Sequence, residues 1–195
     1  MYALVHVPKT GGTSIKKSIP NLCRGMHRPV SWFDNHDHDH TFMTMVRDPY
    51  DTAASGYFFT KRQGIKQGST DFDIYHKNLI WKENVDVNTF LEKTVPNHRY
   101  AYYFDTKSIE DFDYVGYTYD MKASVELANK MFDMNIYYRA VNTNPSHTLG
   151  NEYNLGYSRQ AFKERHSKDY DIYNAGVERF LYLCQTYNIP TSLIQ

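Results

Sequence analysis

The sequence predicts an α/β protein: a single domain, residues 1–195, in which a mainly parallel sheet is flanked by helices. Apolar runs of strand length alternate along the chain with stretches of helical periodicity. Two of those runs, residues 2–7 and 41–46, lead directly through a turn into a helix. A chain of 195 residues can bury a core of its own, and no linker-like segment divides it. Because ligands of such folds bind at the carboxyl ends of the strands, these two turns are the first candidates for function.

The turn that follows residues 2–7 has the composition of an anion site. It carries one lysine, two glycines and three hydroxyl side chains, namely Lys9, Thr10, Gly11, Gly12, Thr13 and Ser14. Glycine lets the backbone approach a ligand closely, and the start of the following helix presents N–H groups with a positive dipole. The lysine adds a mobile charge and the hydroxyl groups add donors. The segment therefore predicts a binding site for a phosphate-like group.

The run 41–46 ends in a second candidate anion site. It is followed by Arg47, by Asp48 as a helix N-cap, and by Pro49 at the first helical position. Ser55 lies eight residues after Arg47, about two turns of helix, so its hydroxyl comes round towards the same ligand. Because the arginine fork suits a phosphate dianion, this segment predicts a second phosphate contact.

The other elements follow from caps, aromatic content and apolar spacing. Asp71, Asp86 and Ser158 are candidate N-caps, and the apolar residues of segment 120–134 recur at helical spacing. The expected helices cover residues 50–59, 71–81, 86–95, 120–134, 158–166 and 170–187, and the expected further strands cover 22–27, 100–104 and 114–117. We expect loops at 28–40 and 61–70 and an extended segment at 136–141.

Charge and cysteine content exclude several classes of partner. Lysine plus arginine and aspartate plus glutamate number 22 each, so no overall field attracts nucleic acid or an anionic membrane, and anion affinity has to be local. No apolar stretch approaches the roughly 20 residues that span a bilayer. The first strand leaves no room for a signal peptide, so we expect a cytoplasmic protein without a membrane anchor. Cys23 and Cys184 are too few for a disulfide framework, and we expect both to be reduced.

The two candidate anion segments together resemble a known family. The lysine of the first turn precedes both glycines, so the turn does not match the G-x-x-x-x-G-K-[ST] pattern of common nucleotide loops. Its order, Pro-Lys-Thr-Gly-Gly-Thr-Ser, resembles the 5′-phosphosulfate loop of sulfotransferases that use 3′-phosphoadenosine 5′-phosphosulfate (PAPS). The segment from Arg47 to Ser55 resembles their 3′-phosphate-binding segment. Residues 112–118 and 141–173 resemble later, less specific parts of carbohydrate-type members.

This resemblance implies a P-loop-like fold, PAPS as donor and PAP as product. It implies in-line transfer of a sulfuryl group to a hydroxyl acceptor, for which we expect a glycan or a small molecule. Lys9 would stabilise the leaving oxygen, Thr13 and Ser14 would hold the 5′-phosphate, and Arg47 and Ser55 the 3′-phosphate. No metal is required, and we assign none. The Arg-Lys-Gly element of cytosolic members is missing from this sequence, so residues 142–148 are the candidates to cover that face of the 3′-phosphate, or the face stays open.

For the catalytic base we favour His27, because a neutral imidazole suits proton abstraction near neutral pH. Residues 27–31 also resemble the region that holds the catalytic histidine in related enzymes. His36 and His38, in the alternating histidine and aspartate run 35–40, stay open as second choices. That run could also bind a divalent ion, but its alternate residues would face opposite ways in an extended segment, so we favour a solvated loop.

Two other functions stay open at this point. One is a P-loop-type nucleotide kinase or phosphotransferase, although the lysine stands in the wrong place for it. The other is a non-catalytic PAP-binding or partner-binding module. The loops at 28–40, 61–70 and 142–154 are candidates to form an acceptor groove, and neither the acceptor nor the oligomeric state follows from the sequence.

Overall fold

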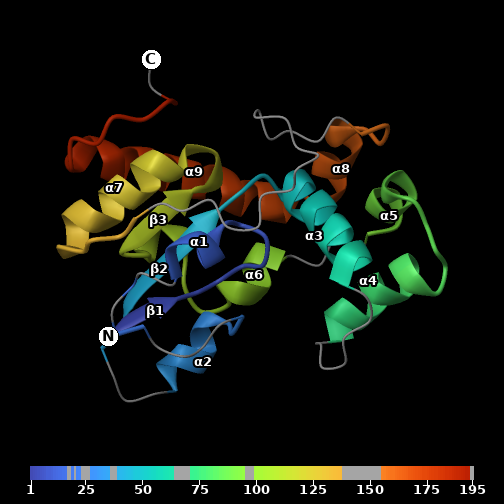
Figure 1. Ribbon diagram of the computed structural model, residues 1–195, viewed down its shortest axis with the longest axis horizontal. Coiled ribbons are helices and arrows are strands. Elements are labelled where there is room, and N and C mark those ends of the chain that lie inside the picture. The colour runs from blue at the N-terminus through green and yellow to red at the C-terminus, as the bar shows by residue number, and fades with distance from the viewer. Residues whose placement is uncertain are drawn as a thin grey trace.

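The computed structural model describes residues 1–16, 19, 21–22, 27–35, 39–63, 71–94, 99–137 and 155–193, with backbone alone for 14, 63 and 71–75 (Figure 1). Its strands are β1 (Tyr2–Leu4), β2 (Thr41–Val46) and β3 (Tyr114–Tyr117). The helices of this part of the chain are α1 (Gly12–Lys16), α2 (Val30–Asp34), α3 (Pro49–Gln63), α4 (Asp71–Trp81), α5 (Val87–Lys93), α6 (Arg99–Tyr103), α7 (Met121–Phe132), α8 (Arg159–Arg165) and α9 (Ser167–Thr186). Short 3-10 helices cover Ile109–Asp111 and Thr118–Asp120.

The three strands form one parallel sheet in the order β1-β2-β3. Leu4 pairs with Met43, and Met43 also pairs with Tyr114. The N–H of Val5 continues the ladder by donating to the Met43 carbonyl at 2.9 Å. The α/β class with a parallel sheet is thus confirmed, with three strands in the described part of the chain. Because parallel strands end at the same edge, the segments that follow all three strands meet there.

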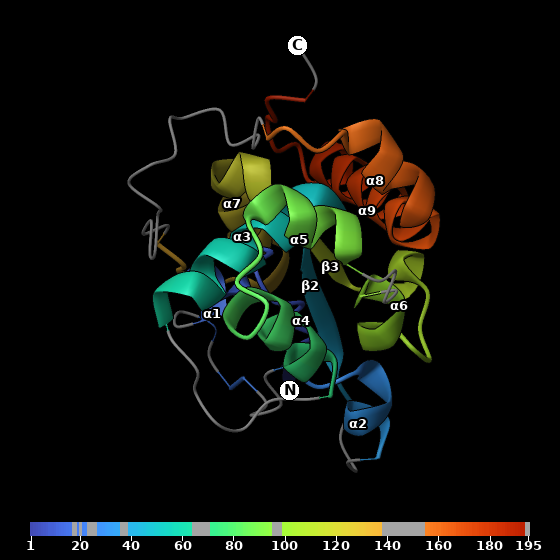
Figure 2. The ribbon, with the colours of Figure 1, turned by 90° about the vertical axis from the view of Figure 1, so that its right-hand side faces the viewer.

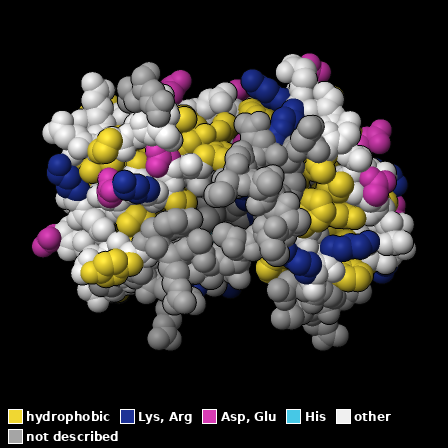
Figure 3. Space-filling model, turned by 45° about the horizontal axis from the view of Figure 1, so that its top comes forward, with side chains coloured by type: hydrophobic (Ala, Val, Ile, Leu, Met, Phe, Trp, Pro, Cys, Tyr) yellow, Lys and Arg dark blue, Asp and Glu magenta, His cyan; other side chains and the backbone are white. Residues whose placement is uncertain are grey.

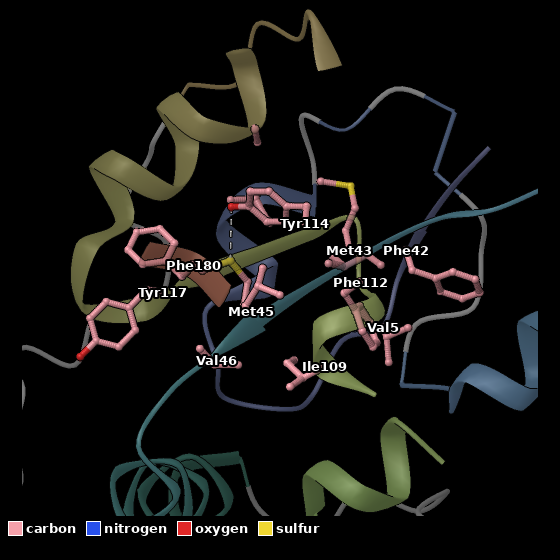
Figure 4. Close-up of a cluster of buried hydrophobic side chains, with 14 of the residues drawn as sticks. Val5, Phe42, Met43, Met45, Val46, Ile109, Phe112, Tyr114, Tyr117 and Phe180 are labelled. Atoms are coloured by element: carbon pink, nitrogen blue, oxygen red, sulfur yellow. Dashed lines mark hydrogen bonds between the residues drawn. The ribbon is translucent and has the colours of Figure 1, made fainter. Parts of the chain in front are cut away.

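Helices cover both faces of this sheet (Figure 4). On one face, the hydroxyl of Tyr114 donates to the Ser124 carbonyl of α7 at 2.9 Å. On the other face, Tyr117 packs on Phe180 of α9 with ring centroids 5.7 Å apart. The two tyrosines are three positions apart on β3, so their side chains point to opposite faces. The sheet therefore lies between α7 and α9.

A second hydrophobic cluster lies away from the sheet, among α3, α4, α5 and α8 (Figures 1 and 2). Its buried members are Tyr50, Ala53, Ala54, Tyr57, Leu79, Ile80, Phe90, Leu91, Phe162 and Tyr170. Helix α9 belongs to both clusters, because Tyr170 near its start lies in the second and Phe180 lies in the core of the sheet. Helix α9 therefore connects the sheet with the helices of the second cluster.

Most predicted elements of the described residues are confirmed. The strand at 41–46 and the strand at 114–117 have the predicted bounds. The carboxylate of Asp48 accepts the N–H of Asp51 at 3.1 Å, and Ser158 accepts the N–H of Ala161, as N-caps do. Asp86 caps α5 in the same way. Helix α9 begins earlier than predicted, at Ser167.

The strand predicted at residues 100–104 is wrong, because Arg99–Tyr103 form helix α6. The carboxylate of Asp169 accepts the N–H groups of Arg99 at 3.1 Å and of Tyr100 at 2.9 Å, which satisfies the first donors of the helix. The loop predicted at 28–40 also contains a helix, α2, whose Val30 and Phe33 are buried. In both segments, contacts with distant parts of the chain decide the local structure.

Several predictions lie outside the described residues: Cys23, His36, His38, residues 138–154 and most of the strand expected at 22–27. Of that strand, Leu22 forms a single bridge with Tyr2. Cys184 is buried and free. Among the described helices, none combines the length and the apolar character that crossing a bilayer requires.

Candidate functional site

The segments that follow the three strands contact one another at the carboxyl edge of the sheet. The guanidinium of Arg47, after β2, donates through Nη1 to the carbonyl of Lys9, after β1, at 3.2 Å. The hydroxyl of Thr118, after β3, lies within hydrogen-bond distance of the carbonyls of Val46 (2.9 Å) and of Thr10. The two segments predicted as anion sites therefore contact each other, with Thr118 bridging them.

The loop after β1 turns sharply, and its own side chains hold its shape. Lys9 has a φ of 72° and Gly11 a φ of 90°, a region that favours glycine. The side chain of Thr10 is fully buried, and its hydroxyl donates to the Val7 carbonyl at 2.8 Å. Of the three hydroxyls that the sequence offers to a ligand, that of Thr10 therefore points into the protein and stabilises the loop.

Gly12 begins α1, and its lack of a side chain makes room for a histidine. A Cβ at position 12 would lie 2.5 Å from the ring of His6. The imidazole of His6 is buried, and burial, followed by the charges of His27, Lys16 and Lys9, lowers its pKa to about 3. His6 is therefore neutral near pH 7. Sequence reasoning missed His6, because it lies within an apolar run and belongs to no motif.

The predicted base, His27, lies directly beside this loop. Its ring stacks on that of His6, with centroids 4.7 Å apart and an angle of 29° between the planes. Its Nδ1 lies 3.1 Å from the His6 carbonyl oxygen. Because a carbonyl oxygen can only accept, Nδ1 carries the proton of a neutral His27, and Nε2 keeps the free electron pair. The exposed His27 is thus at the same end of β1 as Lys9.

The ammonium group of Lys9 lies over α3, 4.1 Å from the centroid of the Phe59 ring. Burial, followed by the charges of Arg47 and Arg62, lowers the pKa of Lys9 to about 8. Ser55, half-buried, precedes Phe59 by four residues and therefore lies one turn away on the same face of α3. The structure thus brings Lys9 next to Arg47 and onto the face of α3 that carries Phe59.

Arg47 is half-buried, and its backbone is held from α6. The Tyr100 hydroxyl accepts the N–H of Arg47 at 2.8 Å and donates to its carbonyl at 2.6 Å. The guanidinium carbon of Arg47 lies 5.9 Å from the centroid of the Tyr119 ring. Within the described part of the chain, neither Arg47 nor Lys9 forms an ion pair with a carboxylate. The Nε of Arg47 is buried and has no hydrogen-bond partner there. Two adjacent cations therefore face the site without a carboxylate.

The remaining predicted residues are placed less fully. Thr13 lies in α1 and is half-buried, and Ser14 follows it in the same helix, with only its backbone described. Residues 142–148, expected to cover the 3′-phosphate, lie outside the described residues. On the face that Figure 3 shows, the lysine and arginine side chains of the described residues are interspersed with aspartate and glutamate.

A pocket of the described structure lies elsewhere. Helices α3, α6, α8 and α9 line it, and it includes Thr52, Tyr100 and Asp169 but neither of the two cations. We place the candidate site at Lys9 and Arg47 because an anion site is defined by donors and charge, not by enclosed volume.

Comparison of this chain with protein-family models, with curated proteins and with solved structures gives no match. A function for the chain therefore has to be derived from the arrangement of these residues.

Proposed function

We propose that this protein is a sulfotransferase that moves a sulfuryl group from PAPS to a hydroxyl acceptor. The observation that carries the proposal is the adjacency of Lys9 and Arg47 at the carboxyl edge of the sheet, joined by the 3.2 Å hydrogen bond to the Lys9 carbonyl. Two like charges in a half-buried position raise the free energy of the protein, and a bound polyanion removes that cost. The site thus favours a ligand with more than one negative group.

The donor would lie across both segments. The glycine loop, the start of α1 and Lys9 would hold the 5′-phosphosulfate, and Arg47 with Ser55 would hold the 3′-phosphate. This assignment is supported by the order of the loop residues and by the stacking of His27 beside the loop. It is also supported by the position of Lys9 over Phe59, which lies on the same face of α3 as Ser55. A carbohydrate hydroxyl is the acceptor that we propose.

The residues divide the chemistry between them. The acceptor oxygen forms a bond to sulfur while the bond between sulfur and the bridging oxygen breaks. The acceptor proton passes to Nε2 of His27, whose Nδ1 is held by the His6 carbonyl at 3.1 Å. The electron pair of the broken bond stays on the phosphate of PAP, where the ammonium of Lys9 stabilises it.

Calorimetry with PAP and with ATP tests the proposal, followed by transfer of label from PAPS to a panel of sugars, phenols and peptides. We expect PAP to bind without magnesium and more tightly than ATP. Lys9→Ala and Arg47→Ala each lose a charge-assisted contact, which should weaken PAP binding by about tenfold or more. Lys61→Ala is the matched control, because that lysine contacts the Asn84 side chain instead.

The other outcomes separate the competing functions. Tighter binding of ATP with magnesium would identify a nucleotide kinase or phosphotransferase. Tight binding of PAP without transfer to any acceptor would identify a PAP-binding module. Failure to bind PAP at all would contradict the proposed function.

A further inference from the structure

Two carboxylates lie close behind Arg47. Asp48 is its neighbour in the chain, and Asp51 lies in the first turn of α3. The side chain of Asp51 is fully buried, and that of Asp48 is 19% exposed. Because an arginine fork matches a carboxylate as well as it matches a phosphate, either aspartate would be a competing partner for Arg47.

Arg159, the first residue of α8, occupies both carboxylates instead. Its Nη1 lies 3.3 Å from Asp48, and its Nη2 forms an ion pair with Asp51. Its guanidinium also packs over the ring of Tyr50, 4.4 Å from the centroid. Arg159 therefore pairs with both carboxylates at the start of α3 from a helix that follows more than 100 residues later in the chain.

Two tyrosines complete the shell of these carboxylates. The Tyr170 hydroxyl donates to Asp48 at 3.3 Å, and the Tyr119 hydroxyl donates to Asp51. The ring of Tyr119 also faces the guanidinium of Arg47, and both Asp51 and Arg47 act on its hydroxyl electrostatically. Tyr119 thus stands between the buried carboxylate and the cation of the proposed site.

We propose that Arg159 is a positioning residue that keeps the guanidinium of Arg47 available to an anion, an inference that rests on the proposed function. By satisfying Asp48 and Asp51, it removes the competition for Arg47 without contacting the ligand itself. Without Arg159, the buried carboxylate of Asp51 loses its ion pair, and we expect Arg47, which shares the Tyr119 contact with it, to turn towards it. Arg47 would then leave the Lys9 carbonyl and be lost to the site.

The variant Arg159→Gln tests this inference. We expect its affinity for PAP to fall by about tenfold or more, comparable to that of Arg47→Ala. The second variant, Arg159→Gln with Asp51→Asn, removes the competing charge together with its partner, and we expect it to recover most of the lost affinity. A merely structural role of Arg159 would not predict this recovery. The double variant also contains no uncompensated charge at Asp51, so it keeps the test usable if the single variant does not fold.

Arg165→Gln is the matched control within α8. Its guanidinium donates to the Thr94 carbonyl at 2.6 Å and to the Tyr157 hydroxyl at 3.0 Å, away from both aspartates. We expect this variant to lose stability and to keep the PAP affinity of the unmodified protein. A loss of affinity in Arg165→Gln equal to that in Arg159→Gln would overturn the inference, as would a loss in Arg159→Gln that the second substitution does not reverse.

A crystal structure of Arg159→Gln, or of Arg159→Met if the glutamine variant does not crystallise, gives a readout independent of PAP. We expect Arg47 to contact Asp51 or Asp48 in the variant. If Arg47 still donates to the Lys9 carbonyl there, the inference is wrong even when PAP binds. If Arg47 has turned but the unmodified protein does not bind PAP, the positioning role holds and the proposed function fails.

Discussion

The imidazole of His27 stacks on that of His6 with ring centroids 4.7 Å apart, and its Nδ1 lies 3.1 Å from the His6 carbonyl. This pairing fixes two properties that a general base needs. The ring has one orientation, and its proton is on Nδ1, so Nε2 is the basic nitrogen. His27 also has a φ of 61°, which is uncommon for a residue other than glycine. The backbone at this position is thus shaped to bring the ring onto His6.

We predict that His27→Ala lowers kcat by about 10²–10⁴ while the affinity for PAP stays nearly unchanged, because a base acts on the acceptor and not on the donor. Steady-state kinetics and calorimetry on the same preparation measure both quantities. His36→Ala and His38→Ala are the controls, since the sequence leaves those histidines open as bases. Normal turnover in His27→Ala, with loss in either control, would transfer the role to that control residue.

Proton uptake provides a second prediction. With a pKa of about 8, Lys9 is partly neutral near that pH in the free protein. A bound phosphate stabilises the ammonium form and raises the pKa, so binding takes up a proton and the affinity for PAP falls as the pH rises through about 8. Calorimetry in two buffers of different ionisation enthalpy should give different apparent binding enthalpies. In Lys9→Arg the difference should disappear, because arginine does not titrate. Equal enthalpies for the unmodified protein would argue against Lys9 as an anion ligand.

Gly12→Ala is predicted to destabilise the fold by roughly 1–3 kcal/mol, a range typical of overpacking. The new Cβ would lie 2.5 Å from the buried ring of His6. Gly56→Ala is the control, since its Cβ would meet nothing nearer than 4.0 Å within α3, where alanine is the better helix former. Urea denaturation measures both. The combination of Gly12→Ala with His6→Ala should recover part of the loss. Wild-type stability in Gly12→Ala would show that the glycine serves the ligand alone.

The sequence predicted those parts of the site that local chemistry determines. The loop at Lys9, the turn at Arg47 and the caps at Asp48, Asp86 and Ser158 each depend on residues within a few positions of one another. Its failures have a common cause, which is long-range contact. Helix α6 forms where a strand was predicted because Asp169 caps it from 70 residues away. The proposed role of Arg159 could not be predicted from the sequence for the same reason, since it depends on the contact between α8 and α3.

Thr118→Val is predicted to lower both the stability of the fold and the affinity for PAP. The hydroxyl of Thr118 lies within hydrogen-bond distance of the Val46 carbonyl (2.9 Å) and of the Thr10 carbonyl, so one side chain after β3 contacts the end of β2 and the loop after β1. Valine keeps the shape of the side chain and removes the donor, which should cost about 1–2 kcal/mol of unfolding free energy. Because the loop and Arg47 would lose their common anchor, the affinity for PAP should fall as well. Thr186→Val, which removes a hydroxyl bonded to the Tyr182 carbonyl within α9, is the matched control and should leave PAP binding unchanged. Urea denaturation and calorimetry measure the two effects separately. A Thr118→Val protein that loses stability but binds PAP normally would show that the two anion segments keep their relative position without this bridge.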